Sequence, residues 1–359
     1  MTILDRYITR EFARLFFLVL ALFTSLFMIV EFFERIRMFL SNNASLTQML
    51  SYFFFMIPVM VSQTLPATAL LAALLTFSTL ARNSEVLAMK ANGISLYRTS
   101  LPVFIASLLI CIVAFLNNEL VTPYSNQKAD NIVYVEVQKR EALGTFKQNQ
   151  LWYRGQNGIY NFRLFDPKSN IIQGITINYL DNNFTLTGRI DAEKAEWKDN
   201  KWVFYNLMIT RFGGEFPSLE WASSRVIDLP ETPVDFNLVQ KEAEKMGFLE
   251  LRNYIAKLQA EGYDATRYLV DMHGKIAFTL VIIILITIGI SFSLIRTERS
   301  GGVMQSIGVG IIIGFSYWIV HAFSMSLGRS GSIPPVLSAW FANMLFGVAS
   351  VIMFLRVKT

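Results

Sequence analysis

The stretch Arg82 to Ser100, RNSEVLAMKANGISLYRTS, is a polar island between two long apolar runs. It carries the residues that begin and end a short helix, in the order cap, acidic first turn, basic last turn and stop: Asn83 or Ser84, Glu85, Lys90 and Gly93. The pattern predicts a helix over about residues 84–92, which is marginal in water by itself because it is so short. Lipid headgroups, the protein's own helix ends or a partner must therefore cover its apolar side chains.

The composition around this island is that of a membrane protein. Of the 359 residues, 53% are hydrophobic and only 16% are charged. Six apolar segments have about the length needed to cross roughly 30 Å of hydrocarbon. They are Leu15 to Phe33, Met49 to Leu80, Leu101 to Val121, Ile276 to Ile295, Val303 to Leu327 and Val336 to Leu355. Three come before a long polar middle and three after it.

The distribution of Lys and Arg predicts the orientation of these spans. One set of flanks carries most of the basic residues: Arg6, Arg10, Arg14, Arg82, Lys90, Arg98, Arg296, Arg299, Arg356 and Lys358. The opposite short loops carry only Arg35, Arg37 and Arg329. We therefore expect both termini and the 84–92 helix in the cytoplasm, and the polar middle outside. The first 14 residues predict an amphipathic helix on the inner surface rather than a cleaved signal. The net charge of +5 is largely explained by the inner flanks and indicates no nucleic-acid partner.

Between the third and fourth spans the apolar residues tend to alternate, beginning with IVYVEV at Ile132 to Val137. Turn signals separate these runs at Asp166 to Asn170, Asp181 to Asn183, Lys198 to Asn200 and Gly213-Gly214. Many short strands with regular turns predict an all-β, jelly-roll-like domain. Its interior is either a closed core or, if one end is open, a slot for an acyl chain.

These signals predict four parts of the chain. Residues 1–123 hold the first three spans with the cytoplasmic helix, 124–245 the β domain, 246–275 a helical stalk and 276–359 the last three spans. Within the stalk, FLELRNYIAKLQA at Phe248 to Ala260 predicts an amphipathic helix, and a second short helix leads into the fourth span. The expected fold class is therefore a six-span α-helical membrane protein with an inserted periplasmic β domain.

The outer end of the first span carries Glu31, Glu34, Arg35 and Arg37. Ionisable groups at membrane depth are candidates for function. They can equally be helix-end residues that reach the interface, with Glu31 pairing to Arg35 one turn later.

Other residues within the spans have structural and functional interpretations side by side. Pro58 and Pro66 predict a bend or an interfacial start in the second segment, and the small residues after Pro66 permit close helix contact. Gly310 and Gly314 form a GxxxG pair in the fifth span, which suits a fixed or a sliding interface. His321 in the same span is more typical of a hydrogen-bonded structural residue than of a proton relay.

Motifs for enzyme chemistry are missing from the sequence. There is no GxxxxGK[ST] phosphate loop and no GxSxG elbow, and two histidines with one cysteine cannot form an ordinary zinc site. We predict no catalytic residue, cofactor or metal.

Four stretches carry a family resemblance: LDRYI at Leu4 to Ile8, RNSEVLAMKANGIS at Arg82 to Ser95, GYDATRYLVDMHGKI at Gly262 to Ile276 and SIPPVLSAW at Ser332 to Trp340. With them the chain resembles the lipopolysaccharide-export permeases of the LptF/LptG type along nearly its whole length. The Ile-Pro-Pro before the last span is more similar to the LptG branch.

The resemblance implies a set of partners and sites. LptG-type permeases pair with LptF over the dimeric cytoplasmic ATPase LptB, and LptC and LptA form the periplasmic bridge that receives lipopolysaccharide. The ATPase-coupling residues would be Arg82, Ser84, Glu85, Val86, Met89 and Gly93. The first and fifth spans would form gates with the partner permease, with Gly310, Gly314 and His321 in the fifth. Lipid contacts would be Glu31, Arg35 and Arg37, although family members often place basic residues where this chain has Glu31.

Two other functions are compatible with the residues alone. A membrane-anchored assembly or receptor protein would use the β domain to bind a periplasmic partner without transport. A membrane transferase acting on lipid would need an acid or base that the sequence does not offer.

Overall fold

The computed structural model describes residues 2–357 apart from 140–143, 148–149, 155–157, 167–169, 182–184, 213–215, 234–242, 261–263 and 296–302. The chain divides into two compact units. A helical unit consists of Met1–Val133 with Ala243–Thr359, and a β domain lies between them at Tyr134–Glu242.

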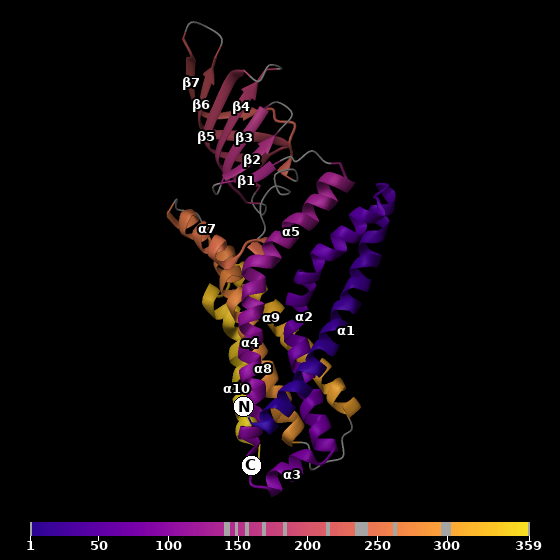
Figure 1. Cartoon of the computed structure of the whole chain (residues 1–359). Helices are drawn as coiled ribbons and strands as arrows, with labels where there is room; N and C mark the ends of the chain where they lie inside the picture. The colour runs from indigo at the N-terminus through magenta and orange to yellow at the C-terminus, as the bar shows by residue number, and fades with distance from the viewer. Residues whose placement is uncertain are drawn as a thin grey trace. The chain divides into compact units, whose positions relative to one another are not determined.

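In the described part of the chain, six helical stretches are long and apolar enough to cross a membrane. They contain α1 (Ile3–Ser41), α2 (Leu46–Arg82), α4 (Leu96–Leu116), α8 (Thr266–Ile295), α9 (Val303–Arg329) and α10 (Pro335–Leu355) (Figure 1). The predicted fold class, six membrane helices with an inserted β domain, is confirmed.

The spans differ in how far the rest of the protein covers them. In the most apolar window of each helix, 72% of the residues are buried in α2 and 67% in α8, but only 11% in α1 and 17% in α9. The small residues predicted to allow a close approach on α2 do so at Ala73, because a Cβ added at Gly289 of α8 would lie 3.1 Å from Ala73 Cβ. α2 and α8 therefore form the centre, and α1 and α9 expose most of their length.

Buried polar side chains join the helices, and two clusters of them each link three helices. Ser78 of α2 lies 2.8 Å from Ser306 of α9 and 3.1 Å from Ser293 of α8, oxygen to oxygen. Asn343 of α10 donates to the Ala277 carbonyl of α8 at 2.7 Å and accepts from the Tyr317 hydroxyl of α9 at 2.8 Å. Since water is absent from a bilayer core, such internal bonds satisfy these polar groups.

The third span is longer than predicted. After α4 the chain remains helical through a π-helix (Asn117–Val121), α5 (Thr122–Asn131) and a second π-helix (Ile132–Val137). The prediction that IVYVEV is a strand was therefore wrong. The Thr122 amide bonds the Asn117 carbonyl five residues back, so Pro123 falls in the first turn of α5, where a proline is tolerated.

The predicted stalk helix is α7 (Phe248–Ala260). Its first turn is held by the Glu119 carboxylate, which accepts from the amides of Phe248 and, at 3.0 Å, Leu249. The predicted second short helix is wrong, because α8 runs unbroken from Thr266 through Gly274. A Cβ added at Gly274 would lie 2.6 Å from Met325 Cε of α9, so glycine here permits close packing and does not end the helix.

The β domain contains one antiparallel sheet whose strands are adjacent in chain order. They are β1 (Gly144–Lys147), β2 (Gln150–Arg154), β3 (Gly158–Asp166), β4 (Ile171–Leu180), β5 (Leu186–Lys198), β6 (Lys201–Arg211) and β7 (Ser218–Ile227). The turn signal at 198–200 falls between β5 and β6, as predicted. The signals at 166–170 and 181–183 lie mostly outside the described residues. The predicted turn at Gly213-Gly214 lies outside the described residues.

A row of residues without ladder partners crosses the sheet at one level. The ladder pairs are missing at Arg163, Gly174, Glu193 and Asn206, although the register is the same on both sides of each gap. Gly174 and Asn206 have left-handed backbones, with φ of 59° and 49°. On both sides of the row the apolar side chains face the same way, so buried positions step from 162 to 165, 192 to 195 and 204 to 207. The row thus lets one apolar face continue across a bend in the sheet.

The segment after β7 packs on this apolar face. Leu229 joins the buried cluster of the β domain. The Trp202 indole donates to the Glu231 carbonyl at 2.8 Å, and the Tyr160 hydroxyl donates to the Glu231 carboxylate at 2.9 Å. Glu231 is buried, and these bonds satisfy its polar atoms.

Candidate functional site

The polar island folds as α3 (Glu85–Ala91), a helix of seven residues between α2 and α4. Ser84 occupies the capping position with a left-handed backbone, but its side chain makes no capping bond. Gly93 follows the helix with φ of 76°, where its amide bonds the Lys90 carbonyl and the Ile94 amide bonds the Met89 carbonyl. These two backbone hydrogen bonds are typical of a helix that ends at a glycine, so the helix ends as predicted.

The inner side of α3 is covered by the protein's own helix ends. Val86 and Met89 are buried in a cluster with Ile8 and Phe12 of α1 and Leu96 of α4. These two predicted coupling residues therefore hold α3 in place and are not presented at the surface. The sequence left open whether lipid headgroups, the protein's own helix ends or a partner cover α3. On this side the protein's own helix ends do so.

The other side of α3 is exposed. Leu87 has 65% of its surface accessible, and Lys90, Ala91 and the preceding Arg82 are exposed too. Glu85 is half-buried, beside Tyr7 of α1, and accepts a hydrogen bond from Asn83 at 3.2 Å. α3 thus presents an apolar residue with charges around it.

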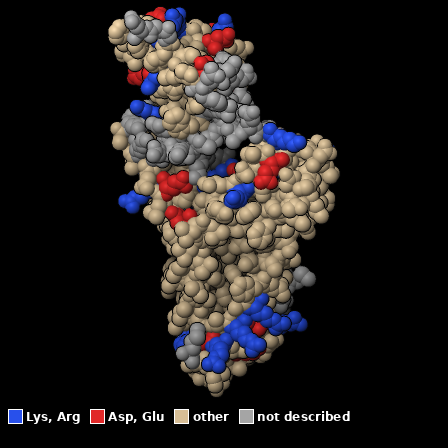
Figure 2. All heavy atoms as spheres, turned by 45° about the horizontal axis from the view of Figure 1, so that its top comes forward, with Lys and Arg blue, Asp and Glu red and all other residues tan. Residues whose placement is uncertain are grey.

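Basic residues gather at this end of the helical unit. Figure 2 shows Lys and Arg concentrated there, and a broad belt of the unit with hardly any charge on the face in view. Arg6, Arg10, Arg14 and Arg356 are all exposed. These members of the basic set predicted from the flanks therefore lie at the surface, whereas Arg296, Arg299 and Lys358 lie outside the described residues.

An ion pair that the sequence analysis missed lies next to α3. Arg98 of α4 donates from Nη1 to Asp5 Oδ1 at 2.7 Å and from Nη2 to Asp5 Oδ2 at 3.0 Å. Asp5 also accepts from the Thr2 amide at 2.8 Å, which completes a capping box at the start of α1. Asp5 stands within LDRYI, but no pattern in the sequence indicated its partner.

The predicted lipid contacts lie at the opposite end of α1. Arg35 Nε lies 3.0 Å from Glu31 Oε1, so the predicted pairing is present. Arg35 and Arg37 are exposed. On the same part of α1 and the start of α2 lies an apolar cavity of about 350 Å³, lined by Met28, Ile29, Phe32, Phe33, Leu46, Met49, Leu50 and Phe53.

The glycine pair of α9 faces α2 of the same chain. A Cβ added at Gly310 would lie 2.5 Å from Leu71 Cδ2 and 2.6 Å from Leu74 Cδ1, whereas one at Gly314 would make an ordinary 3.7 Å contact with Leu70. Exposed apolar residues of α9 lie elsewhere on the helix and include Ile311, Ile312, Phe315 and Trp318. His321 stacks on Tyr317 at 5.7 Å between ring centroids, and its Nδ1 has no hydrogen-bond partner among the residues that the structure describes.

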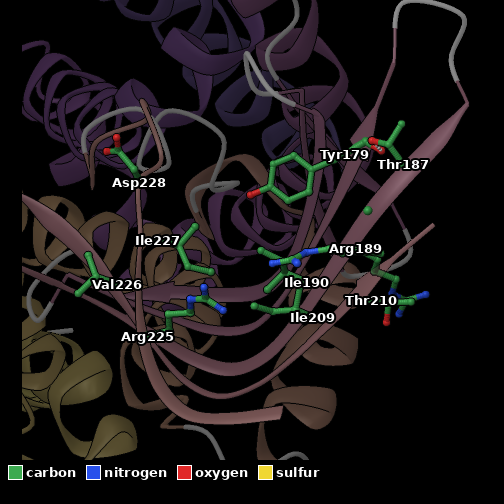
Figure 3. A pocket seen from close by; sticks show the side chains of 12 residues that line it. Tyr179, Thr187, Arg189, Ile190, Ile209, Thr210, Arg225, Val226, Ile227 and Asp228 are labelled. Atoms are coloured by element: carbon green, nitrogen blue, oxygen red, sulfur yellow. Dashed lines mark hydrogen bonds between the residues drawn. The ribbon is translucent and has the colours of Figure 1, made fainter. Parts of the chain in front are cut away.

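The β domain contains a cavity of about 520 Å³ at one end of its apolar face. Figure 3 shows Tyr179, Ile190, Ile209 and Ile227 pointing toward it, together with the guanidinium of Arg225. Burial and the nearby Glu231 raise the pKa of the Tyr179 hydroxyl, which therefore stays neutral. The cavity combines an apolar floor with a charged rim.

The fold and this site define a class: a multi-pass membrane protein with an inserted β domain and a short helix held at the basic end of its bundle. Comparison with known families narrows this class, since the family described as lipopolysaccharide export system permease LptF/LptG matches residues 6–356. The chain belongs to the LptF/LptG family, which confirms the resemblance.

The chain is similar to its relatives over nearly their whole length. The lipopolysaccharide export system permease protein LptG of Escherichia coli K12 is 25% identical, over 99% of this chain and 98% of its own. The protein of the same name from Haemophilus influenzae is 22% identical, over 96% of this chain and 95% of its own.

Proposed function

We propose that the chain is a permease subunit of an ATP-driven exporter that extracts lipopolysaccharide from the outer leaflet of the inner membrane. A separate cytoplasmic ATPase of the LptB kind would supply the energy, because the sequence has no phosphate loop of its own. The other partners would be a second permease like LptF and a periplasmic bridge like LptC and LptA. Membership of the LptF/LptG family supports this proposal.

The proposed orientation places both termini and α3 in the cytoplasm and the β domain in the periplasm. It is supported by the exposed arginines around α3, because basic residues near the ends of spans remain on the cytoplasmic side.

The observation that carries the proposal is the placement of α3. A helix of seven residues whose inner side is fixed by Val86 and Met89 can present Leu87 and Glu85 to a groove on another protein. Glu85 would meet basic residues there, because its carboxylate can accept charge-assisted hydrogen bonds. Arg82, Ser84 and Gly93 would set the position of the helix at its two ends.

The lipid path would follow the least covered helices. α1 and α9 bury few of their apolar residues within this chain, so each has a long surface for a partner permease or for lipid. Arg35 and Arg37 would bind phosphate groups of the lipid by charge-assisted hydrogen bonds, and the adjacent apolar cavity would take part of an acyl chain. Gly310 would keep α9 close to α2, and Gly314 and His321 lie further along the same helix.

The β domain would pass the lipid onward. β7 is an edge strand with exposed Leu219, Trp221 and Val226, and free edges of this kind can pair with a neighbouring sheet. The apolar floor of the β-domain cavity suits an acyl chain in transit.

Reversal of the charge at Glu85 tests the proposal. The full exporter, reconstituted in vesicles with lipopolysaccharide, should keep ATP hydrolysis when Glu85→Lys is introduced and lose extraction by about tenfold, the usual size of a coupling free energy between sites. Glu193→Lys, an exposed carboxylate of the β domain, is the matched control and should extract normally. An unchanged extraction rate in Glu85→Lys would count against the proposal.

Photo-crosslinking distinguishes a transporter from a membrane-anchored receptor that does not transport lipid. A transporter should capture glycolipid from probes at Arg35, Arg37 and Ile190, which lie at the first-span end and inside the β domain. A receptor should capture it at none of the three.

A further inference from the structure

The ion pair between Asp5 and Arg98 joins equivalent positions of two helices. Asp5 is the third residue of α1, after the cap Thr2, and Arg98 is the third residue of α4, after the cap Ser95. Each is bonded to its own cap, because the amides of Asp5 and Arg98 donate to the cap hydroxyls at 3.3 and 3.2 Å. The pair therefore connects two rigid first turns rather than two flexible side chains.

The contact geometry favours a stiff connection. Two parallel bonds of 2.7 and 3.0 Å fix the guanidinium in the plane of the carboxylate. The Asp5 side chain is only 11% exposed, and the Thr2 amide holds its second oxygen from the other side. Such a bidentate, partly buried pair resists rotation of one helix against the other.

α3 is attached directly to one partner of this pair. Only Asn92, Gly93 and Ile94 separate α3 from the Ser95 cap of α4, and Gly93 and Ile94 are bonded back to α3. Met89 contacts Thr99 of α4, with 3.7 Å between Sδ and Oγ1. A displacement of α3 must therefore move the first turn of α4.

The helix on the other side of the pair, α1, is the least covered of the six spans in its most apolar part. In the most apolar part of α1, 11% of the residues are buried. The corresponding value is 72% in α2, the helix that precedes α3 in the chain. If α3 moves, α1 can shift more readily than α2, because α2 is packed in the centre of the helical unit.

We propose that Asp5 and Arg98 are positioning residues that carry a displacement of α3 and α4 to α1, the helix with the most exposed lipid-facing surface. This inference rests on the proposed function, in which an ATPase displaces α3. Neither residue contacts the lipid or the ATPase in this role. The pair sets how far α1 follows each ATPase cycle.

The test uses the full exporter in vesicles and measures ATP hydrolysis and lipopolysaccharide extraction separately. Asp5→Asn and Arg98→Gln should each keep hydrolysis and reduce extraction per ATP by about tenfold. The exchanged pair Asp5→Arg with Arg98→Asp should recover part of the extraction, since it restores opposite charges. Asp130→Asn is the matched control, because it removes another ion pair of the helical unit, with Lys245 at 2.8 Å, away from α3.

A distance measurement gives a readout that loss of stability would not imitate. Spin labels at Leu22 of α1 and Leu109 of α4, both exposed, can be placed in a Cys111→Ser background. The distance between them should stay constant when ATP is added to the wild-type complex and should change with ATP in Asp5→Asn. A wild-type distance that changes with ATP would overturn the inference.

The remaining outcomes separate the two proposals. Wild-type vesicles that extract nothing with ATP contradict the proposed function, and the role of the pair with it. Normal wild-type extraction with unaffected single variants contradicts the pair alone. Variants that lose hydrolysis and extraction in equal proportion, with less assembled complex, show that the pair is only structural.

Discussion

The Tyr52 hydroxyl of α2 donates a hydrogen bond of 2.5 Å to Glu31 Oε1 of α1, the same oxygen that accepts from Arg35. Tyr52 is buried, and its ring stands at 63° to that of Phe39 with 5.4 Å between centroids. Glu31 is therefore part of the α1–α2 contact. The same carboxylate holds Arg35 on the part of α1 that lines the apolar cavity.

Tyr52→Phe should lower the stability of the helical unit. A buried hydrogen bond to a charged acceptor contributes about 1.5–3 kcal/mol, so the melting temperature in detergent should fall by several degrees. Tyr124→Phe is the control, because Tyr124 is 56% exposed and its ring contact with Phe55 is kept. Equal melting temperatures for the two variants would mean that the Tyr52 bond adds nothing.

The two glycines of the GxxxG pair should respond in opposite directions to alanine. Gly310→Ala forces Leu71 and Leu74 to move, and overpacking of this kind costs about 1–3 kcal/mol. Gly314→Ala meets only an ordinary contact, so the better helix propensity of alanine should stabilise it by up to about 1 kcal/mol. Melting curves of the two single variants in detergent decide this. A stabilised Gly310→Ala would show that α9 does not rest on α2.

The six spans and α3 could be predicted because their signals are local. About 20 apolar residues cross a bilayer whatever they pack against, and a glycine that follows a basic turn ends a helix by itself. The Glu31 to Arg35 pair is equally local, one helical turn apart.

The third span could not be bounded in this way. Alternating β-branched residues in IVYVEV are typical of a strand, but here a preceding helix continues through them, and Val133 and Val137 are buried. Propensity is a weak signal, and tertiary contacts override it. The same applies to Gly274, which ends no helix because Met325 packs against it.

Contacts between distant segments leave no periodic trace. Asp5 and Arg98 are 93 residues apart. In the sequence, each is therefore only a charged residue near the start of a helix. In the sheet, the alternation of apolar residues changes phase at Gly174 and Asn206. In the sequence, this change looks like the end of a strand pattern. Only the register shows that one apolar face continues.

The last prediction concerns acid and the outer surface of the β domain. Lys194 and Lys198 both form ion pairs with Glu196, and Tyr205 donates to the same carboxylate at 3.3 Å. Hydrogen bonds from the two lysines lower the pKa of Glu196 from 4.5 to about 2. Because the pKa in the folded state is the lower one, the stabilisation is complete above about pH 4.5 and is lost as the pH falls toward 2.

Unfolding of the full chain by urea, which does not screen ion pairs, measures this if the signal comes from the β domain alone. Trp318→Phe with Trp340→Phe leaves the four tryptophans at 152, 197, 202 and 221, all within that domain. In this background Glu196→Gln should lower the unfolding midpoint at pH 7, and the difference from the parent should shrink between pH 4.5 and 2. Glu193→Gln is the control for the loss of one surface carboxylate, because Glu193 is an exposed residue of the same strand, β5. A difference that stays constant down to pH 2 would show that the lysines do not bind Glu196 in solution.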